Sequence, residues 1–353
     1  MQTEVSGDGV VKNKIIKMYK LFPILLLLLS IQTTAQKSLK VISLKETKRI
    51  ETILSADDMM GRRAFSASNE KAAAFIVSEF EKIGLKKWKD GDSYLQTFPM
   101  VKKTNANNRS IYTFDLTQQG EQVKLSNVVG ILPGKSKPNE YVIFSGHFDH
   151  IGTSTRNMQN NDSIFNGAND DAAGTTAMIM LAKYFKKLNN NERTIVFAAF
   201  NAEEMGGFGA TYFSKQFDPA QVVAMFNIEM IGTESKWGNN SAYITGFEKT
   251  NMGEILQKNL TGTGFEFHAD PYPDQQLFYR SDNATLARLG VPAHTISTSK
   301  MDSEPNYHKA SDEIGTINLK NMNEIIKAIA LSSRGIVAGT ETPSRVDTSS
   351  LKR

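Results

Sequence analysis

The sequence predicts an α/β protein whose central sheet carries helices on both faces. Short, nearly continuous apolar runs occur through the middle of the chain, and such runs are typical of strands covered on both sides. Helical patterns separate these runs, and strands that alternate with helices indicate a sheet packed between layers of helices. The chain has 353 residues, of which 40% are hydrophobic, so it is long enough to bury a large core.

The first 35 residues are predicted to be a signal peptide that stands outside the fold. A lysine-rich stretch leads into the apolar run LFPILLLLLSI, and small residues follow at Thr33 and Ala35. This order is typical of a secretory signal, and the run is short for a membrane span. We therefore expect an exported protein, periplasmic or extracellular, with no stable membrane span after cleavage. The alternative is a retained N-terminal anchor.

Two helices are predicted ahead of the central strands. Apolar residues recur at helical spacing from Ser43 to Leu54, and a stronger stripe runs through SASNEKAAAFIVSEFEKIGLKKW. We expect Ser68 or Asn69 to cap this second helix and Gly84 to end it. The polar stretch 102–122 is interpreted as a pair of strands with loops.

The central strands are predicted at the apolar runs NVVGIL, YVIFSG, TIVFAAF and VVAMFNI, with a long helix at DAAGTTAMIMLAKYFKKL. Further elements follow at GEILQKNL, ATLARLG and VPAHTIS, and a closing helix is predicted at NLKNMNEIIKAIALSSRGIVAG. No internal repeat or long linker interrupts the chain, so residues 36–340 are interpreted as one domain. Residues 341–353 are expected to form a frayed polar tail.

Charge and composition exclude several classes of function. The net charge of +4 is small and forms no basic block, which argues against nucleic-acid binding. The chain has no cysteine, which removes disulfides, thiol catalysis and thiolate zinc ligands. No G-x-S-x-G motif occurs, so serine hydrolase chemistry is not expected.

Imidazole and carboxylate side chains follow several of the predicted strands. In an open α/β sheet, ligands bind beyond the carboxyl ends of the strands, so we expect these side chains to share one crevice. Zinc takes such ligands, and the number present suits a pair of metals better than one. Considered one pair at a time, Asp170 and Asp171 would be interpreted as helix caps, and Glu203 and Glu204 as residues on a solvent-exposed surface. The set comprises His147, Asp149, His150, Asp170, Asp171, Glu203, Glu204, Glu229 and His308.

Five motifs in order resemble the M28 family of zinc peptidases: SGHFDHIG, NGANDDAAG, FAAFNAEEMGGFGA, FNIEMIG and NYHKASDE. The resemblance covers roughly residues 45–338. It implies a zinc-aminopeptidase-like fold, a single large domain with a mixed, mostly parallel central sheet. It also implies a zinc-dependent exopeptidase with peptide substrates. An aminopeptidase that removes N-terminal residues by a water activated between two zinc ions is the closest match.

The resemblance also implies a role for each site residue. Two ligand sets would share a bridging aspartate: Asp170, Glu204 and His308 for one zinc ion, and Asp170, His147 and Glu229 for the other. Glu203 matches the general base, and Asp149 matches the carboxylate that orients the histidine ligand.

Glu229 departs from the family pattern, which has aspartate at this position. Glutamate is still a hard oxygen ligand, although it is one methylene longer. The alternative is that Glu229 does not bind and that its metal site is weakened. Among the other residues, His150 is interpreted as a polar loop residue and His294 as a satisfied interior histidine. Ser281 and Asp282 either shape specificity or cap a helix.

Other functions remain open. A glutaminyl-peptide cyclotransferase shares the fold and much of the ligand set, but uses one zinc ion to close N-terminal glutamine into pyroglutamate. A non-catalytic binding protein on the same fold would have no need of the base Glu203. Carboxypeptidase and dipeptidase activities also occur among related proteins, so the direction of cleavage is open.

Overall fold

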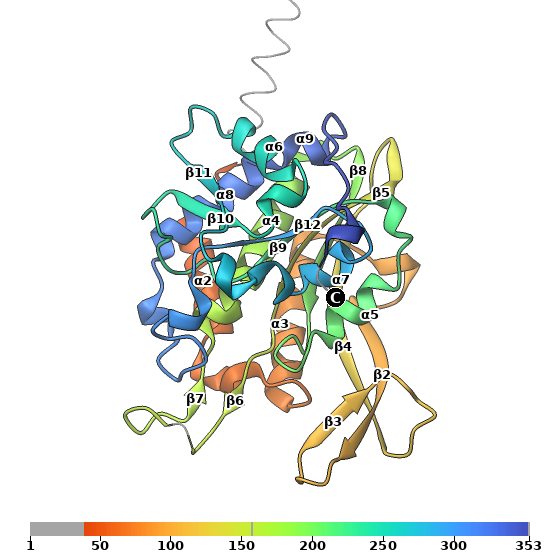
Figure 1. Cartoon of the computed structure of the whole chain (residues 1–353), viewed down its shortest axis with the longest axis vertical. Coiled ribbons are helices and arrows are strands. Elements are labelled where there is room, and N and C mark those ends of the chain that lie inside the picture. Colours follow the sequence, from red (N-terminus) through yellow and green to blue (C-terminus); the bar gives the residue numbers. More distant parts are fainter. Residues whose placement is uncertain (1–38, 157, 352–353) are drawn as a thin grey trace, which may run out of the picture.

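A computed structural model describes residues 39–156 and 158–351 (Figure 1). The predicted signal peptide at residues 1–35 lies outside the described residues. Within the described ranges, no helix has the length and apolar character needed to cross a membrane.

The described part of the chain is organised around a mixed sheet of ten strands. Its main path has the order β11-β10-β12-β9-β5-β8-β4-β2-β3, and β1 pairs with β4. The central strands β12, β9, β5 and β8 run parallel, whereas β10 and β4 join them antiparallel. The strands are β1 (Lys86–Lys87), β2 (Leu95–Thr104), β3 (Ser110–Thr113), β4 (Glu121–Leu132), β5 (Lys137–His147), β8 (Arg193–Phe200), β9 (Val222–Ile228), β10 (Ser241–Ile244), β11 (Glu266–Ala269) and β12 (Ala293–Ser297), with β6 (Gly152–Thr153) and β7 (Ile164–Phe165) paired separately.

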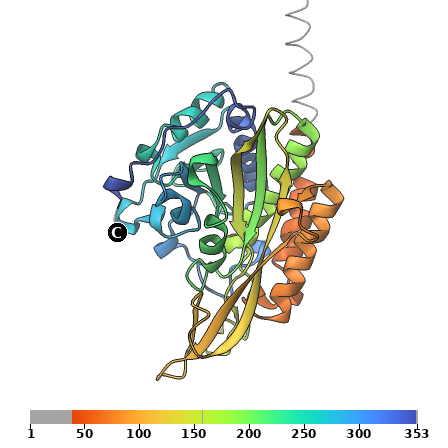
Figure 2. The ribbon, with the colours of Figure 1, turned by 90° about the vertical axis from the view of Figure 1, so that its right-hand side faces the viewer.

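Helices cover both faces of the sheet, which confirms the predicted fold class (Figure 2). One face carries α2 (Leu44–Leu54), α3 (Ala67–Ile83), α4 (Ala173–Leu188), α6 (Met252–Asn259), α8 (Leu319–Ser332) and α9 (Arg334–Val337), and the other carries α5 (Phe208–Ser214) and α7 (Asn283–Ala287). Successive residues of β5 point to opposite cores: Val142 and Phe144 pack under α4, and Ile143 packs toward α5 and α7. This double burial explains the continuous apolar runs.

The N-terminal helices are confirmed, with one cap displaced. The cap of α3 is Ser66, whose side-chain oxygen accepts a hydrogen bond from the backbone N–H of Asn69. The prediction of Ser68 or Asn69 is wrong, because all three residues have capping chemistry and only the path of the chain selects one. Gly84 ends the helix in a left-handed conformation with φ of 73°, as predicted.

The C-terminal segment 341–351 packs along the domain. The Arg345 guanidinium donates to the carbonyl oxygen of Val222 at 2.7 Å, and the N–H of Val346 donates to Gly290 at 3.1 Å. The side chain of Val346 is buried. The prediction of fraying is therefore wrong for this part of the tail. Its anchors are isolated residues in a polar stretch, and they form no periodic pattern.

His294 on β12 is a satisfied interior histidine, as predicted. Its Nδ1 lies 2.8 Å from the carbonyl oxygen of Thr245, and its Nε2 lies 2.8 Å from the hydroxyl of Thr250. Because a carbonyl oxygen can only accept, Nδ1 carries the proton and Nε2 accepts from the hydroxyl. Burial lowers the pKa of His294 to about 4.

The substitution His294→Gln is expected to remove a pH-dependent contribution to stability. The unfolded chain binds a proton at this histidine near pH 6.5, whereas the folded protein resists protonation until about pH 4. Wild-type stability from this group is therefore lost as the pH falls through that window. The difference in unfolding free energy between wild type and variant should shrink by up to about 3 kcal/mol between neutral pH and pH 4. Urea denaturation across pH measures this; parallel pH profiles would contradict it.

Candidate metal centre

Three parallel strands bring the site residues to one edge of the sheet. β5 ends at His147, Glu203 follows the last residue of β8 by three positions, and Glu229 comes directly after β9. Neighbouring parallel strands end at the same edge, so these side chains meet there. Asp170 joins them from the turn Ala168–Ala172 that leads into α4.

The first cluster consists of His147, Asp170 and Glu229, all of them buried. One ligand atom from each residue lies within 4.8 Å of the others. Nε2 of His147 is 3.2 Å from Oδ1 of Asp170, yet it makes no hydrogen bond to any described residue. A buried ring nitrogen without a hydrogen-bond partner, facing two carboxylates, fits a metal ligand.

The backbone of Asp149 fixes the tautomer of His147. Nδ1 of His147 lies 3.1 Å from the carbonyl oxygen of Asp149, but 3.8 Å from its carboxylate. The carbonyl can only accept, so Nδ1 carries a proton, and Nε2 is the ring nitrogen that faces the cluster. The sequence had predicted that the carboxylate orients the ring. That carboxylate instead accepts a hydrogen bond from the backbone N–H of Glu203 at 3.1 Å.

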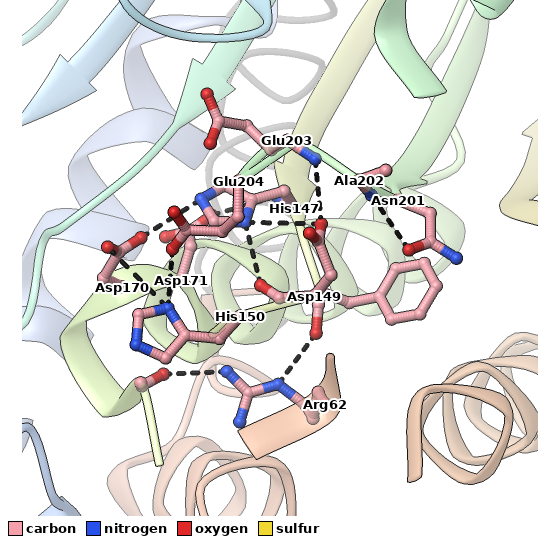
Figure 3. A network of polar contacts seen from close by, with 12 residues as sticks. Arg62, His147, Asp149, His150, Asp170, Asp171, Asn201, Ala202, Glu203 and Glu204 are labelled. Carbon is pink, nitrogen blue, oxygen red and sulfur yellow. Dashed lines mark hydrogen bonds and ion pairs between the residues drawn. The ribbon is translucent and has the colours of Figure 1, made fainter. Parts of the chain in front are cut away.

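The second cluster shares Asp170 and adds Glu204 and His150 (Figure 3). His308 also contacts both carboxylates. Nε2 of His308 lies 3.2 Å from Asp170 and 3.1 Å from Glu204. Nδ1 of His150 lies 2.7 Å from Glu204. His150 had been interpreted as a polar loop residue, but its side chain is buried and belongs to a group that could hold a metal. Its place in the loop directly after a buried strand was the signal available.

Asp170 links the charges of the two clusters. Burial by itself would raise the pKa of Asp170, but His147 and His308 hold it well below its usual range. Burial would lower the pKa of His308, but Asp170 and Glu204 raise it to about 10. Burial raises the pKa of Glu229 to about 7. So many buried carboxylates in one place form a site that a divalent cation would neutralise.

Glu203 lies beside the clusters, and its environment suits a proton acceptor. Burial raises the pKa of Glu203 well above its usual range, and the negative charges of Glu229, Asp282 and Glu204 add to the effect. His147 opposes this rise. A carboxylate whose pKa is raised binds a proton more readily than an ordinary glutamate does, as a residue that accepts a proton must.

Asp171 holds three backbone segments of the centre together. Its carboxylate accepts hydrogen bonds from the N–H groups of His147 at 3.0 Å, Gly174 at 2.9 Å and Met230 at 3.2 Å. The bond from Gly174 reaches the first turn of α4, but the N-cap residue of this helix is Ala172, so Asp171 lies one residue outside the capping position. The other two bonds place the backbones of His147 and of the residue after Glu229.

Asp312 and Ser281 support the clusters, and Asp282 lies buried nearby without such a contact. Asp312 accepts from the backbone N–H groups of Asn169 at 2.9 Å and Asp170 at 3.0 Å, a role that the sequence did not reveal. Ser281 donates a hydrogen bond to the Glu229 carboxylate. Asp282 is buried at the start of α7 without a side-chain capping bond, and its carboxylate has no hydrogen-bond partner among the described residues.

The mixed sheet carries two clusters of imidazole and carboxylate groups at the ends of its strands. These groups are the ligands of a two-metal centre, so the fold and the site together are those of a two-metal α/β protein. The sequence model of peptidase family M28 matches residues 127–332, which is more than half of the chain. The chain belongs to this family.

Curated relatives are similar over a shorter stretch. A probable zinc metalloprotease of Pyrenophora teres f. teres is 31% identical over 115 residues, which cover 32% of this chain and 23% of that protein. The chain thus spans about a quarter of the length of the curated relatives it matches.

Solved structures share the fold at low sequence identity. A zinc aminopeptidase from Bacillus subtilis has a TM-score of 0.65 and 16% identity, over 85% of this chain and 97% of that one. A glutaminyl cyclase from Bacteroides thetaiotaomicron has a TM-score of 0.61 and 14% identity, over 85% and 99%. Both likenesses concern the fold alone.

The substitution Asp171→Asn is expected to destabilise the protein by about 2–4 kcal/mol. An amide offers one acceptor oxygen, so at least one of the three backbone N–H groups loses its partner in the interior. Urea denaturation of the metal-free protein measures the loss. Asp58→Asn is the control, because Asp58 pairs with Lys71 on the exposed surface and should contribute less than about 1 kcal/mol. Equal stability of the two variants would contradict the role of Asp171.

Proposed function

We propose that this protein is an exported zinc-dependent aminopeptidase that removes N-terminal residues from peptides. The observation that carries the proposal is the pair of clusters that share Asp170, with Glu203 beside them. Membership of family M28 supports peptide hydrolysis, and the zinc aminopeptidases among the similar structures support action at the N-terminus. Export rests on the N-terminal sequence pattern alone.

The residues present fit a pair of zinc ions. His147, Asp170 and Glu229 would hold one ion, and Asp170, Glu204 and His308 the other. Nε2 of His147 is a buried atom without a hydrogen-bond partner among the described residues, and a bound ion would satisfy it. Zinc ions supply a carbonyl-polarising charge and lower the pKa of a water toward neutrality.

Glu203 is the residue that would move the proton. Its carboxylate takes a proton from the attacking water and returns it to the leaving amine. The hydrogen bond from its backbone N–H to Asp149 fixes the start of the side chain, so the loop need not reorganise during the reaction. Glu204, the next residue, points into the second cluster (Figure 3). The two adjacent glutamates therefore serve different tasks.

A cavity of about 260 Å³ gives access to the second cluster. Its lining includes Glu204, His150 and His308, with Arg63 and Ile151 nearby on the wall. Candidate metal ligands thus form part of the cavity wall, and a peptide end placed here would lie against the metal centre.

A glutaminyl-peptide cyclotransferase is the second candidate, favoured by the structural likeness to the cyclase from Bacteroides thetaiotaomicron. The first cluster favours the peptidase, because His147 and Glu229 offer ligands for a second ion that a one-zinc enzyme does not need. A purely binding protein would have no use for a proton acceptor at Glu203.

The deciding experiment is mass spectrometry of a peptide with N-terminal glutamine, incubated with the protein and zinc, with and without a chelator. Stepwise loss of N-terminal residues that the chelator abolishes supports the aminopeptidase. Loss of ammonia alone assigns the cyclotransferase, and loss from the C-terminus assigns a carboxypeptidase. No change with this and several varied peptides would overturn the proposal.

Glu203→Gln is expected to lower kcat by about 10²–10⁴-fold while zinc binding is retained, because the amide cannot accept the proton. Steady-state kinetics and equilibrium zinc binding on the same preparation separate the two effects. Turnover close to wild type would remove Glu203 from the role of base.

Glu229→Ala tests whether the longer side chain supports a full second site. We expect two tightly bound zinc ions per chain in the wild type and one in the variant, since the first cluster loses a carboxylate. Elemental analysis after equilibrium dialysis counts the ions. Exposed Glu70→Ala is the control and should retain both. An unchanged count in Glu229→Ala would show that Glu229 is not a ligand.

A further inference from the structure

Arg62 is a cation in the interior with an unusual set of partners. Its side chain is 0% exposed, and no carboxylate of the described residues lies within ion-pairing distance of it. Its guanidinium instead donates four hydrogen bonds, all to backbone carbonyl oxygens. Burying a charge without an ion-pair partner costs free energy, so we expect these hydrogen bonds to serve a function.

The four carbonyl groups come from three separate segments. One is Leu54 at the end of α2, at 2.6 Å. The second is Phe148 at 2.8 Å, which lies between His147 and Asp149. The third segment supplies Asn166 at 2.6 Å and Gly167 at 2.9 Å, just ahead of Asp170. In Figure 3, Arg62 lies beneath His150 and Asp149, with hydrogen bonds toward the loops on either side.

The backbone around Arg62 is shaped for this contact. Met60, Gly61 and Arg62 all have positive φ, at 46°, 65° and 49°. A Cβ atom at Gly61 would lie 2.4 Å from the carbonyl oxygen of Phe165 and 2.5 Å from that of Gly152, so the chain presses directly against β6 and β7. Non-glycine residues with positive φ carry strain, which persists only where the surroundings impose it.

We propose that Arg62 is a positioning residue of the metal centre. It ties the loop of His147 to the loop of Asp170, and so sets the spacing of the first cluster and its affinity for zinc. The inference rests on the metal centre of the proposed function. It goes beyond that function, because the hydrogen bonds of Arg62 all go to backbone carbonyl oxygens and none to the side chain of a candidate metal ligand.

An arginine is required for this contact. Its planar guanidinium carries five N–H donors in a fixed fork and can serve three segments at once. A lysine ammonium is a point donor on a flexible stem, so Arg62→Lys keeps the charge but loses the geometry. Arg62→Met keeps much of the volume and loses every donor.

Arg193 offers a matched control in the same chain. It is also buried, and it donates to the carbonyl oxygens of Ile336 at 2.7 Å and Glu341 at 2.6 Å. It stands at the start of β8, whereas Glu203 follows the end of that strand. Arg193 also forms an ion pair with Glu140 at 2.6 Å, so its loss removes buried hydrogen bonds together with an ion pair, at the amino ends of the strands and away from the metal centre.

The experiment compares Lys and Met variants of Arg62 and Arg193 by two readouts that need no catalysis. Thermal unfolding of the metal-free protein reports stability, and competition with a chromophoric chelator reports zinc affinity. We expect both Met variants to unfold at lower temperature. Only Arg62→Met should weaken zinc binding, by about 10–100-fold, with Arg62→Lys between it and wild type. The visible spectrum of the cobalt-loaded protein should change only in the Arg62 variants.

The proposal would be overturned if the folded Arg62 variants bound zinc as tightly as the wild type and had the same cobalt spectrum. Equal losses of affinity in the Arg193 variants would also overturn it, because the effect would then follow general stability. If Arg62→Met does not fold, Arg62→Lys decides between these outcomes. Normal zinc binding without peptidase activity would refute the proposed function and leave the role of Arg62 standing. A wild-type protein that binds no zinc would refute both.

Discussion

The centre depends on one buried carboxylate that two sets of side chains share. Asp170 presents Oδ1 to His147 and Oδ2 to His308, so neither cluster can move without the other. A carboxylate in this position is stable only if both oxygens are met by cations or donors. The surrounding polar contacts follow from that need: Asp312 holds the backbone N–H of Asp170, and Arg62 holds the carbonyl groups just ahead of it.

The parallel strands make this arrangement possible. The carboxyl-terminal halves of β5, β8 and β9 are buried on both faces, and these strands bring His147, Glu203 and Glu229 to the same end of the sheet. Ligand atoms of His147 and Glu229 lie within 4.8 Å of each other there. Packing on both sides leaves the strand ends little freedom, so the ligands need few additional restraints. Asp171 supplies one of them, since its carboxylate accepts from the backbone N–H of His147 and from that of Met230, the residue after Glu229.

The sequence predicted the central strands and the residues that follow them, because apolar runs and polar strand ends leave a visible pattern. It could not predict Arg62, whose partners are backbone carbonyl groups that any residue supplies. It missed the burial of His150 and the role of Asp312 for a related reason: loops have no periodicity, and only the folded path brings them to the cluster. The prediction of the N-cap of α3 was wrong by two or three residues, because Ser66, Ser68 and Asn69 can all cap a helix.

The exposure of the ligands indicates how a substrate would reach the centre. The side chains of His147, Asp170 and Glu204 are at most 11% exposed, whereas that of His308 is 38% exposed. The sheet edge and the loops held by Arg62 close one side, and the segment that carries His308 leaves the other accessible. The cavity beside His308 and Glu204 lies on that accessible side. A molecule that enters this cavity would meet Glu204, His150 and His308, so the second cluster is the part of the centre that lies open to solvent.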